Sequence, residues 1–206
     1  MKKGLLTVSF LLTTFIAYSQ NAAENTAMRL PNGWSLTPAG KSLPLGDLPL
    51  NIAVSKSHTL VAVTNNGQST QTIQLFDAKN DKELDKVVIA KSWLGLTFSE
   101  DEQYLYASGG DDNQVIRYAI ENNKLIARDT FRLGEPGTKK KDSPAISPAG
   151  IAVDSKKGLL YAVTKQDNSL YVFNIATKEI LKKVPLGAEA YTCLLSPDQT
   201  ELYISL

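Results

Sequence analysis

The chain has 206 residues, of which 43% are hydrophobic and 21% charged, a composition typical of a globular protein with one sizeable core. Its 22 Lys and Arg residues almost balance its 21 Asp and Glu residues, which gives a formal net charge of +1. A charge this small argues against a protein that mainly binds nucleic acid or an anionic membrane surface, and a single histidine excludes a histidine-rich metal site.

The start of the chain has the form of a secretory signal peptide. Lys2 and Lys3 precede an apolar run over residues 4–17, and Ala17-Tyr18-Ser19 has the small-x-small pattern of a cleavage site. We therefore predict that residues 1–19 are a signal peptide and that the mature protein is periplasmic or secreted, with no membrane segment after cleavage. The alternative is an uncleaved anchor, although the run is shorter than the ~20 apolar residues that span a bilayer. The following residues, 20–39, are predicted to be a linker.

Four later segments repeat one pattern, an apolar strand, a polar turn and a second strand. They read NIAVSKSHTLVAVTNNG, GLTFSEDEQYLYASGG, GIAVDSKKGLLYAVTKQ and TCLLSPDQTELYISL. The residues that end the first strand are spaced by 44, 55 and 42 positions: Ser55, Ser99, Asp154 and Ser196. Landmarks in the second strand are spaced by 45, 55 and 42: Val61, Tyr106, Tyr161 and Tyr203. Two independent landmarks agree within one residue, and a period of about 40–45 residues is typical of a β-propeller blade.

Each full repeat holds four short strand candidates separated by turn-forming clusters. In the third repeat the predicted strands are 149–153, 159–163, 169–174 and 179–185. We therefore predict an all-β fold, a partial, open β-propeller of four-stranded antiparallel blades within residues 40–206. Three blades are predicted to be complete and a fourth to be half present, with an insertion before the third blade; the approximate ranges are 48–90, 91–134, 147–187 and 188–206, with the insertion at 134–147.

A second repeat concerns the edge of the propeller. KSLPLG, at Lys41–Gly46, matches KKVPLG, which ends the outermost strand of the third blade. We predict that Lys41–Gly46 is likewise an outermost strand, which closes a ring whose other strands lie beyond Leu206. The chain is then an N-terminal fragment of a longer protein, and alone it is expected to self-associate through its two open faces. The alternative is a short chain that completes a ring with copies of itself.

The loops that enter each innermost strand share one face with the turns between the second and third strands. We predict that this loop face holds a site for a ligand or a protein partner. Its candidate residues are Trp93, Asp111, Asp112, Asn113, Gln166, Asp167 and Tyr191. The competing interpretation is that the polar residues only form hairpin turns and that Trp93 only packs between blades. Lys139-Lys140-Lys141, in the insertion, are expected to form a solvated loop rather than a basic site.

No catalytic set or metal site is predicted, and no cofactor is expected in this chain. Cys193, the only cysteine, lies in an apolar strand pattern and is expected to be a small buried hydrophobe. His58 is expected in a surface turn on the opposite face. The residues that open the innermost strands are all neutral: Asn51, Gly95, Gly150 and Thr192.

The second-strand segments LVAVTNNG, LYASGGDD, LYAVTKQD and LYISL resemble the Tyr-Val-Thr-Asn motif of the YVTN-repeat, YncE-like β-propellers. Longer stretches, such as LPNGWSLTPAGKSLPLGDLPLNIAVS and VPLGAEAYTCLLSPD, are similar to exported bacterial proteins that join such a propeller to a C-terminal phosphoesterase domain of the alkaline phosphatase superfamily. The resemblance implies a seven-bladed ring. It also implies that the metal ligands and the nucleophile belong to the second domain, outside this chain.

Three functions follow as hypotheses. The first is a non-catalytic binding or scaffold module of an exported phosphoesterase, with that hydrolase domain as a partner. The second is a hydrolase carried by the propeller itself, like the lactonases that share this style of repeat. The third is binding of single-stranded nucleic acid, which the balanced charge disfavours.

Overall fold

The computed structural model describes residues 28–36, 40–135 and 146–206. The predicted signal peptide and Lys139–Lys141 lie outside the described residues. Two compact units are formed, residues 1–42 and 43–206. In the first unit the described part is a small hairpin of β1 (Met28–Arg29) and β2 (Ser35–Leu36), which lies within the predicted linker.

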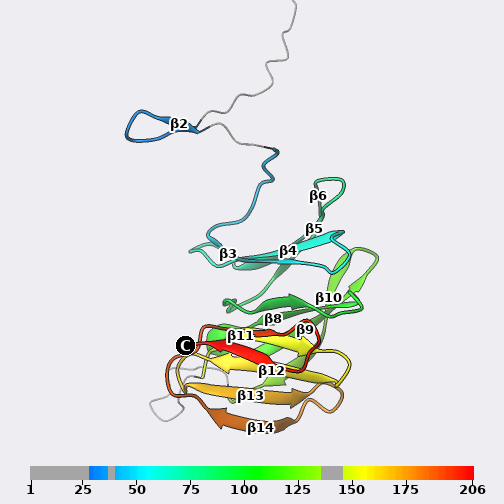
Figure 1. Ribbon diagram of the computed structural model, residues 1–206. Coiled ribbons are helices and arrows are strands. Elements are labelled where there is room, and N and C mark those ends of the chain that lie inside the picture. The colour runs from blue at the N-terminus through cyan, green and yellow to red at the C-terminus, as the bar shows by residue number, and fades with distance from the viewer. Residues whose placement is uncertain (1–27, 37–39, 136–145) are drawn as a thin grey trace, which may run out of the picture. The chain divides into compact units, whose positions relative to one another are not determined.

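The second unit is made of four antiparallel sheets in chain order (Figure 1). Blade 1 contains β3 (Pro49–Val54), β4 (Leu60–Asn65), β5 (Thr72–Asp77) and β6 (Lys82–Val88). Blade 2 contains β7 (Leu96–Phe98), β8 (Tyr104–Ser108), β9 (Gln114–Glu121) and β10 (Lys124–Arg132), with a 3-10 turn, η1 (Gly110–Asp112). Blade 3 contains β11 (Pro148–Asp154), β12 (Leu159–Thr164), β13 (Ser169–Asn174) and β14 (Ile180–Pro185). The half-blade contains β15 (Thr192–Leu195) and β16 (Leu202–Ser205).

This arrangement confirms the predicted fold class, an all-β, open partial propeller of four-stranded blades. In blade 3 every observed strand end lies within one residue of its prediction. The reason is local: each strand is rich in Val, Ile, Leu and Tyr, and each is bounded by turn-forming residues, such as Gly158 with its φ of +65°. No helix in the described residues is long and apolar enough to cross a membrane.

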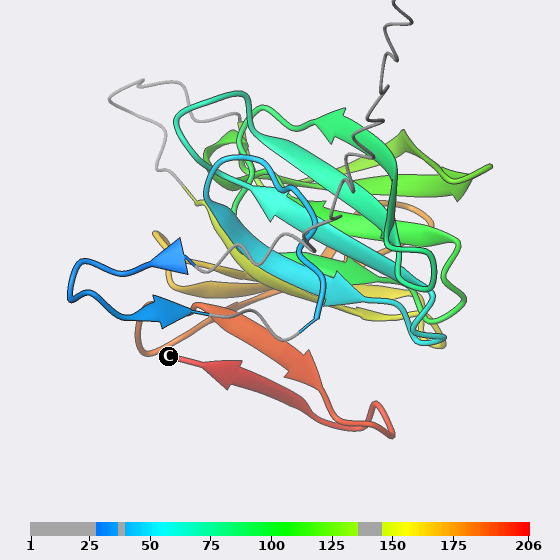
Figure 2. The ribbon, with the colours of Figure 1, turned by 90° about the horizontal axis from the view of Figure 1, so that it is seen from above.

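The core lies between the sheets rather than within any one of them. Separate apolar clusters join blade 1 to blade 2, blade 2 to blade 3, and blade 3 to the half-blade. At the second of these junctions the rings of Phe131, from β10, and Phe173, from β13, meet edge to face with centroids 5.8 Å apart. In Figure 2 the half-blade, drawn in red, follows blade 3, and β15 contacts β11.

Glycines allow the innermost strands of neighbouring blades to come close together. A Cβ added to Gly150, on β11, would lie 2.8 Å from the backbone nitrogen of Cys193 on β15. A Cβ on Gly95, which precedes β7, would lie 3.1 Å from the Ile151 side chain and nearer still to the Ala149 carbonyl oxygen. Both glycines therefore serve blade packing.

The two ends of the arc expose apolar side chains that are covered elsewhere. Leu96, Ile151 and Cys193 occupy equivalent positions on innermost strands and are 7%, 6% and 5% exposed. The equivalent residue of the first blade, Ile52, is 63% exposed. At the other end Leu194 is 69% exposed.

The predicted outermost strand Lys41–Gly46 belongs to none of the strands of this structure. A strand is defined by its hydrogen-bonded neighbour, and no described strand pairs with this segment. Leu43 and Leu45 instead border an apolar cavity of about 310 Å³ with Ile52, Val61 and Phe76 of blade 1. Leu45 is equivalent in sequence to Leu186, which packs against the cluster between blade 3 and the half-blade.

Candidate functional site

Backbone hydrogen bonds build the loop face in each blade. The segment entering the innermost strand is bonded to the turn that follows the second strand. In blade 1 the Asn66 N–H donates to the Leu48 carbonyl (2.9 Å), and in blade 3 the Lys165 N–H donates to the Ser147 carbonyl (3.0 Å). Leu48 and Ser147 are equivalent in the repeat, and each has a φ of +50°. The loops and turns predicted to share one face therefore do so.

A cavity of about 300 Å³ opens among these loops of blades 1, 2 and 3. Most of its lining residues have polar side chains, and they include three of the predicted site residues, Trp93, Asp111 and Gln166. The complete lining is Asn66, Gln71, Lys91, Ser92, Trp93, Gly110, Asp111, Ser147, Lys165 and Gln166. We refer to it below as the loop-face cavity.

Lys165 organises one side of the loop-face cavity. Its ammonium lies 5.5 Å from the centroid of the Trp93 ring and 5.6 Å from that of Tyr191, both within the range of cation–π attraction. The same ammonium is 3.4 Å from a carboxylate oxygen of Glu189. Tyr191 does not line the cavity, but its ring contacts Lys165, which does.

Three residues of the cavity lining each bury a polar side-chain atom that has no hydrogen-bond partner. These atoms are the Asn66 Oδ1, the Ser92 Oγ and the Trp93 Nε1. Ser92 is only 5% exposed, and its backbone N–H is held by the Gln71 Oε1 at 2.7 Å. The Asn66 Nδ2 donates to the Ser92 carbonyl at 2.6 Å. Each buried polar atom without a partner costs about 1–3 kcal/mol, and such atoms are rare in folded proteins. Three of them at one cavity are therefore unusual.

The three consecutive candidates of blade 2 have different surroundings. Asp111 is exposed in the cavity lining and accepts a hydrogen bond from the Ser147 Oγ at 2.6 Å. Asp112 is partly buried outside the lining. Asn113 is 1% exposed, and its Oδ1 accepts the N–H groups of Ile146 and Ser147 at 2.9 and 3.0 Å. The Asn113 side chain thus holds backbone in place and is not open to a ligand.

Gln166 and Asp167 also separate. Gln166 is exposed at the cavity, whereas Asp167 lies among blade 3 residues, where its carboxylate accepts from Tyr171 (2.6 Å) and contacts Lys183 (2.8 Å). Burial opposes ionisation of Asp167, but the hydrogen bonds from Lys183, Thr164 and Tyr171 hold its pKa below the usual range. Its carboxylate therefore already has strong partners.

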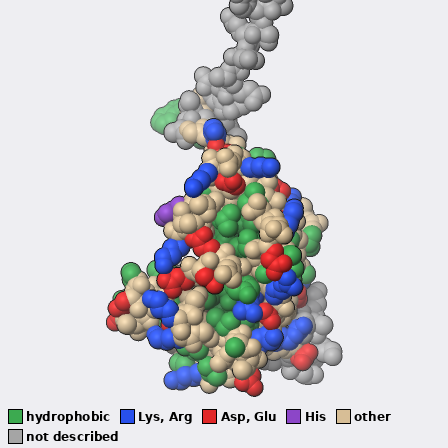
Figure 3. All heavy atoms as spheres, turned by 90° about the vertical axis from the view of Figure 1, so that its right-hand side faces the viewer, with side chains coloured by type: hydrophobic (Ala, Val, Ile, Leu, Met, Phe, Trp, Pro, Cys, Tyr) green, Lys and Arg blue, Asp and Glu red, His purple; other side chains and the backbone are tan. Residues whose placement is uncertain are grey.

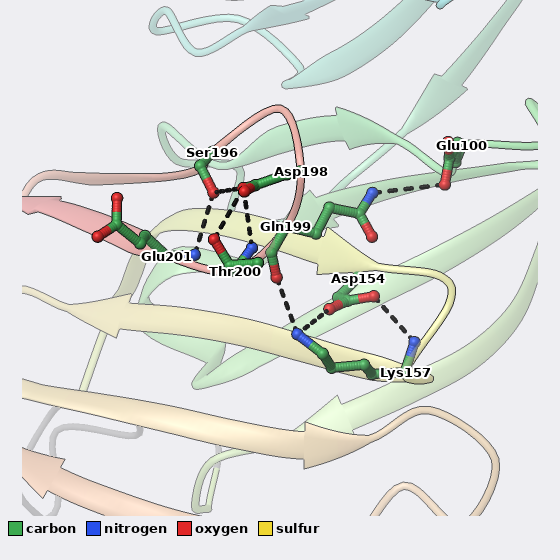
Figure 4. A network of polar contacts seen from close by, with 8 residues as sticks. All are labelled: Glu100, Asp154, Lys157, Ser196, Asp198, Gln199, Thr200 and Glu201. Atoms are coloured by element: carbon green, nitrogen blue, oxygen red, sulfur yellow. Dashed lines mark hydrogen bonds and ion pairs between the residues drawn. The ribbon is translucent and has the colours of Figure 1, made fainter.

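The opposite face carries a polar network that links the sheets (Figure 4). The Gln199 Nε2 of the half-blade donates to the Glu100 carboxylate of blade 2 at 3.4 Å. Lys56 of blade 1, which the figure does not draw, lies 2.8 Å from the other Glu100 oxygen. Lys157 donates to the Gln199 carbonyl at 2.8 Å and lies 3.2 Å from the buried Asp154. His58 is exposed in a turn of this face, as predicted.

Residues with catalytic potential elsewhere have ordinary surroundings. Burial in the half-blade junction raises the pKa of the Cys193 thiol to about 12, so the side chain is a neutral, small apolar group, as predicted. Within the described ranges, no group of three or more His, Cys, Asp or Glu side chains is placed to hold a metal ion. On the face drawn in Figure 3, basic and acidic side chains are interspersed.

Sequence reasoning missed four members of the loop-face cavity that now matter most: Asn66, Ser92, Lys91 and Lys165. Asn66 and Ser92 lie in loops of the predicted face, but the sequence does not show that a side-chain atom of each has no hydrogen-bond partner. Lys165 lies in a turn, 72 positions after Trp93, and no motif connects the two.

Solved structures with a similar fold include the Dos1 propeller, which matches with 14% identity and a TM-score of 0.58, over 76% of this chain and 38% of that one. A protein from Lactobacillus plantarum matches with 15% identity and a TM-score of 0.63, over 80% of this chain and 50% of that one. A functionally unknown protein from Desulfotomaculum acetoxidans matches with 14% identity and a TM-score of 0.62, over 86% and 54%. Hydrazine synthase from Kuenenia stuttgartiensis matches with 15% identity and a TM-score of 0.57, over 80% and 44%. The chain thus spans about half the length of these proteins or less, and identities this low show the fold alone.

The sequence also matches a family profile. Residues 61–206 match the SMP-30/gluconolactonase/LRE-like region. No curated protein matches the chain significantly. The matched region begins in β4 of blade 1 and covers blades 2 and 3 and the half-blade. The chain therefore belongs to the SMP-30/gluconolactonase/LRE-like family of β-propellers.

Proposed function

We propose that this chain is a ligand-binding propeller module whose loop-face cavity receives a small polar molecule, without chemistry of its own. One observation carries the proposal: Asn66, Ser92 and Trp93 each bury a polar atom without a partner, and all three line the same cavity. A polar ligand offsets the cost of those unmade hydrogen bonds once small side-chain rotations turn the groups toward it. The cavity volume, about 300 Å³, is at the small end of ligand sites.

The setting of the module is a second part of the proposal. We propose that the propeller serves an exported phosphoesterase as its recognition or scaffold domain. The support is the sequence resemblance of the Pro-Leu-Gly and Tyr-Val-Thr-Asn-like segments to YncE-like propellers that precede such a domain. The test is to replace the loops of the cavity in the full-length protein. Unchanged phosphoesterase rate and substrate range would contradict a recognition role.

The chain offers a direct optical test of ligand binding. It has two tryptophans, so a Trp34→Phe chain reports on Trp93 alone. We expect saturable changes in Trp93 emission on titration with at least one of D-glucose, sodium gluconate, sodium phosphate and glycine. The comparison variant is Trp34→Phe with Ser92→Ala. It removes one hydroxyl that has no hydrogen-bond partner, and it is expected to weaken the response. No response to any of the four probes would contradict the cavity as a site.

Lactone hydrolysis is the second candidate function, because the family description includes gluconolactonase. Under this alternative the propeller itself opens a sugar lactone. The experiment is to follow acid release from glucono-δ-lactone with a pH indicator, with and without the protein. A rate equal to that of buffer alone rules the alternative out for this chain.

A further inference from the structure

We propose that the ligand of the loop-face cavity carries an oxyanion, a carboxylate or a phosphate, which Lys91 and Lys165 bind. This inference rests on the proposed function and names the chemical class of its ligand. It assigns Ser92 and Trp93 as hydrogen-bond donors to the same ligand.

The free hydrogen-bonding groups of the cavity are mostly donors. A lysine ammonium offers three donors and no acceptor, and an indole N–H only donates. Among the described residues Lys91 is exposed and has no ion-pair partner, and the Ser92 hydroxyl and the Trp93 indole N–H are without acceptors. The partnerless acceptor among the lining residues is the Asn66 Oδ1. A ligand that brings acceptor oxygens satisfies this set better than a neutral polyol, which must also place its own protons.

The charges on the lining point the same way. The lining includes two lysines, Lys91 and Lys165, and one acidic residue, Asp111, whose carboxylate already accepts a hydrogen bond from Ser147. Glu189 pairs with Lys165 and is not part of the lining. Its ion pair spans 3.4 Å between side chains that are 34% and 46% exposed, so water screens it and it is readily exchanged for a ligand.

The position of Lys165 is set before a ligand arrives. The Trp93 and Tyr191 rings both lie within 6 Å of its ammonium, so the charge is held between two aromatic faces. A preplaced cation loses little side-chain freedom on binding, which favours affinity. The same geometry puts Trp93 beside the bound anion, where its emission reports on occupancy.

The experiment titrates the 206-residue Trp34→Phe chain with sodium gluconate, sodium phosphate and D-glucose and follows Trp93 emission. We expect gluconate or phosphate to bind at least ten times more tightly than glucose, and the two salts separate a carboxylate ligand from a phosphate ligand. Lys165→Gln and Lys91→Gln are each expected to weaken anion binding about tenfold. Lys182→Gln, an exposed lysine on β14 away from the lining, is the matched control and is expected to change nothing.

Glu189→Gln is expected to have the opposite effect on anion affinity. Removal of this carboxylate frees Lys165, so anion affinity is expected to rise while the response to glucose stays the same. Added sodium chloride is expected to weaken anion binding by the Trp34→Phe chain, and this measurement needs no substitution in the cavity itself.

Glucose binding as tightly as gluconate and phosphate, or anion binding that is insensitive to salt, overturns the oxyanion inference and leaves the proposed function standing. An unchanged Trp93 emission with all three probes overturns the oxyanion inference, and an unchanged emission with glycine as well overturns both. Anion binding lost in Lys165→Gln and unchanged in Lys182→Gln supports both.

Discussion

Gly150 and Thr192 lie on neighbouring innermost strands, and the Gly150 N–H reaches the carbonyl of the residue before Thr192, Tyr191, at 2.9 Å. A Cβ on Gly150 would press into the backbone of Thr192 and Cys193. The absence of a side chain at Gly150 therefore sets the distance between blade 3 and the half-blade.

We accordingly expect Gly150→Ala to loosen this junction and to lower the free energy of unfolding by about 1–3 kcal/mol. Cys193, buried in the same junction, is the reporter, and its labelling by a thiol reagent under native conditions is expected to speed up. Gly187→Ala is the control, because a Cβ there meets no atom within 4 Å. Equal labelling rates in the two variants would show that the close approach is unimportant.

Asn113 and Asp112 are adjacent but should differ strongly on truncation. Asn113→Ala removes an acceptor for two backbone N–H groups and a donor to the Glu135 carbonyl, so we expect a loss of about 2–3 kcal/mol in urea unfolding. Within the described residues the Asp112 side chain makes no hydrogen bond or ion pair, so Asp112→Ala is expected to change the free energy of unfolding by no more than about 0.5 kcal/mol. Similar losses in both variants would contradict the structural role assigned to Asn113.

Asp154 predicts a pH dependence of stability. Burial opposes its ionisation, but hydrogen bonds from the Lys157 backbone and the pairing with its ammonium bring the net pKa below the usual value. A depressed folded-state pKa stabilises the protein above the unfolded-state pKa of about 3.9, and that contribution is lost as the pH falls through the folded value. Asp154→Asn is therefore expected to be less stable at pH 7 by about 1–3 kcal/mol and to lose less on acidification. Parallel stability curves for the variant and the parent between pH 5 and 2 would refute this assignment.

The open ends of the arc predict head-to-tail association. Ile52 and Leu194 are exposed on the first and last sheets, at positions whose equivalents face a neighbouring blade in the interior of the arc. We expect the chain to form concentration-dependent oligomers, measured by light scattering after gel filtration. Ile52→Asp and Leu194→Asp each block one end, so a mixture of the two variants should stop at dimers. A monodisperse monomer at high concentration would contradict the association.

Strand positions were predictable because each strand and its turns carry local signals. Leu159–Thr164 is a short, mostly apolar run between a Gly-containing turn and a Gln-Asp-Asn turn, and the same pattern recurs in each repeat. The hairpin of Met28–Arg29 and Ser35–Leu36 was missed because two-residue strands are too short to show a period. The strand predicted at Lys41–Gly46 is not formed. A strand needs a partner to pair with, and the local sequence does not show whether one is present.

The sequence predicted which face of the propeller carries the candidate site, but not which residues line it. Asn113, Asp167 and Gln166 look alike in sequence, because turn chemistry and ligand chemistry use the same polar residues. Their roles differ through tertiary contacts: Asn113 holds the Ile146–Ser147 backbone, Asp167 pairs with Lys183, and Gln166 remains at the cavity. The lysine between two aromatic rings required three loops to meet in space.

Because each apolar cluster joins two consecutive sheets, the folded region resembles a short one-dimensional array of coupled units. Blades 2 and 3 are each held by two such couplings, whereas blade 1 and the half-blade have one. Fraying therefore begins at both termini of the array and moves inward. Amide protons of the central strands β9 and β12 are therefore expected to be the last to exchange with solvent, and a single melting temperature would average over units of unequal stability.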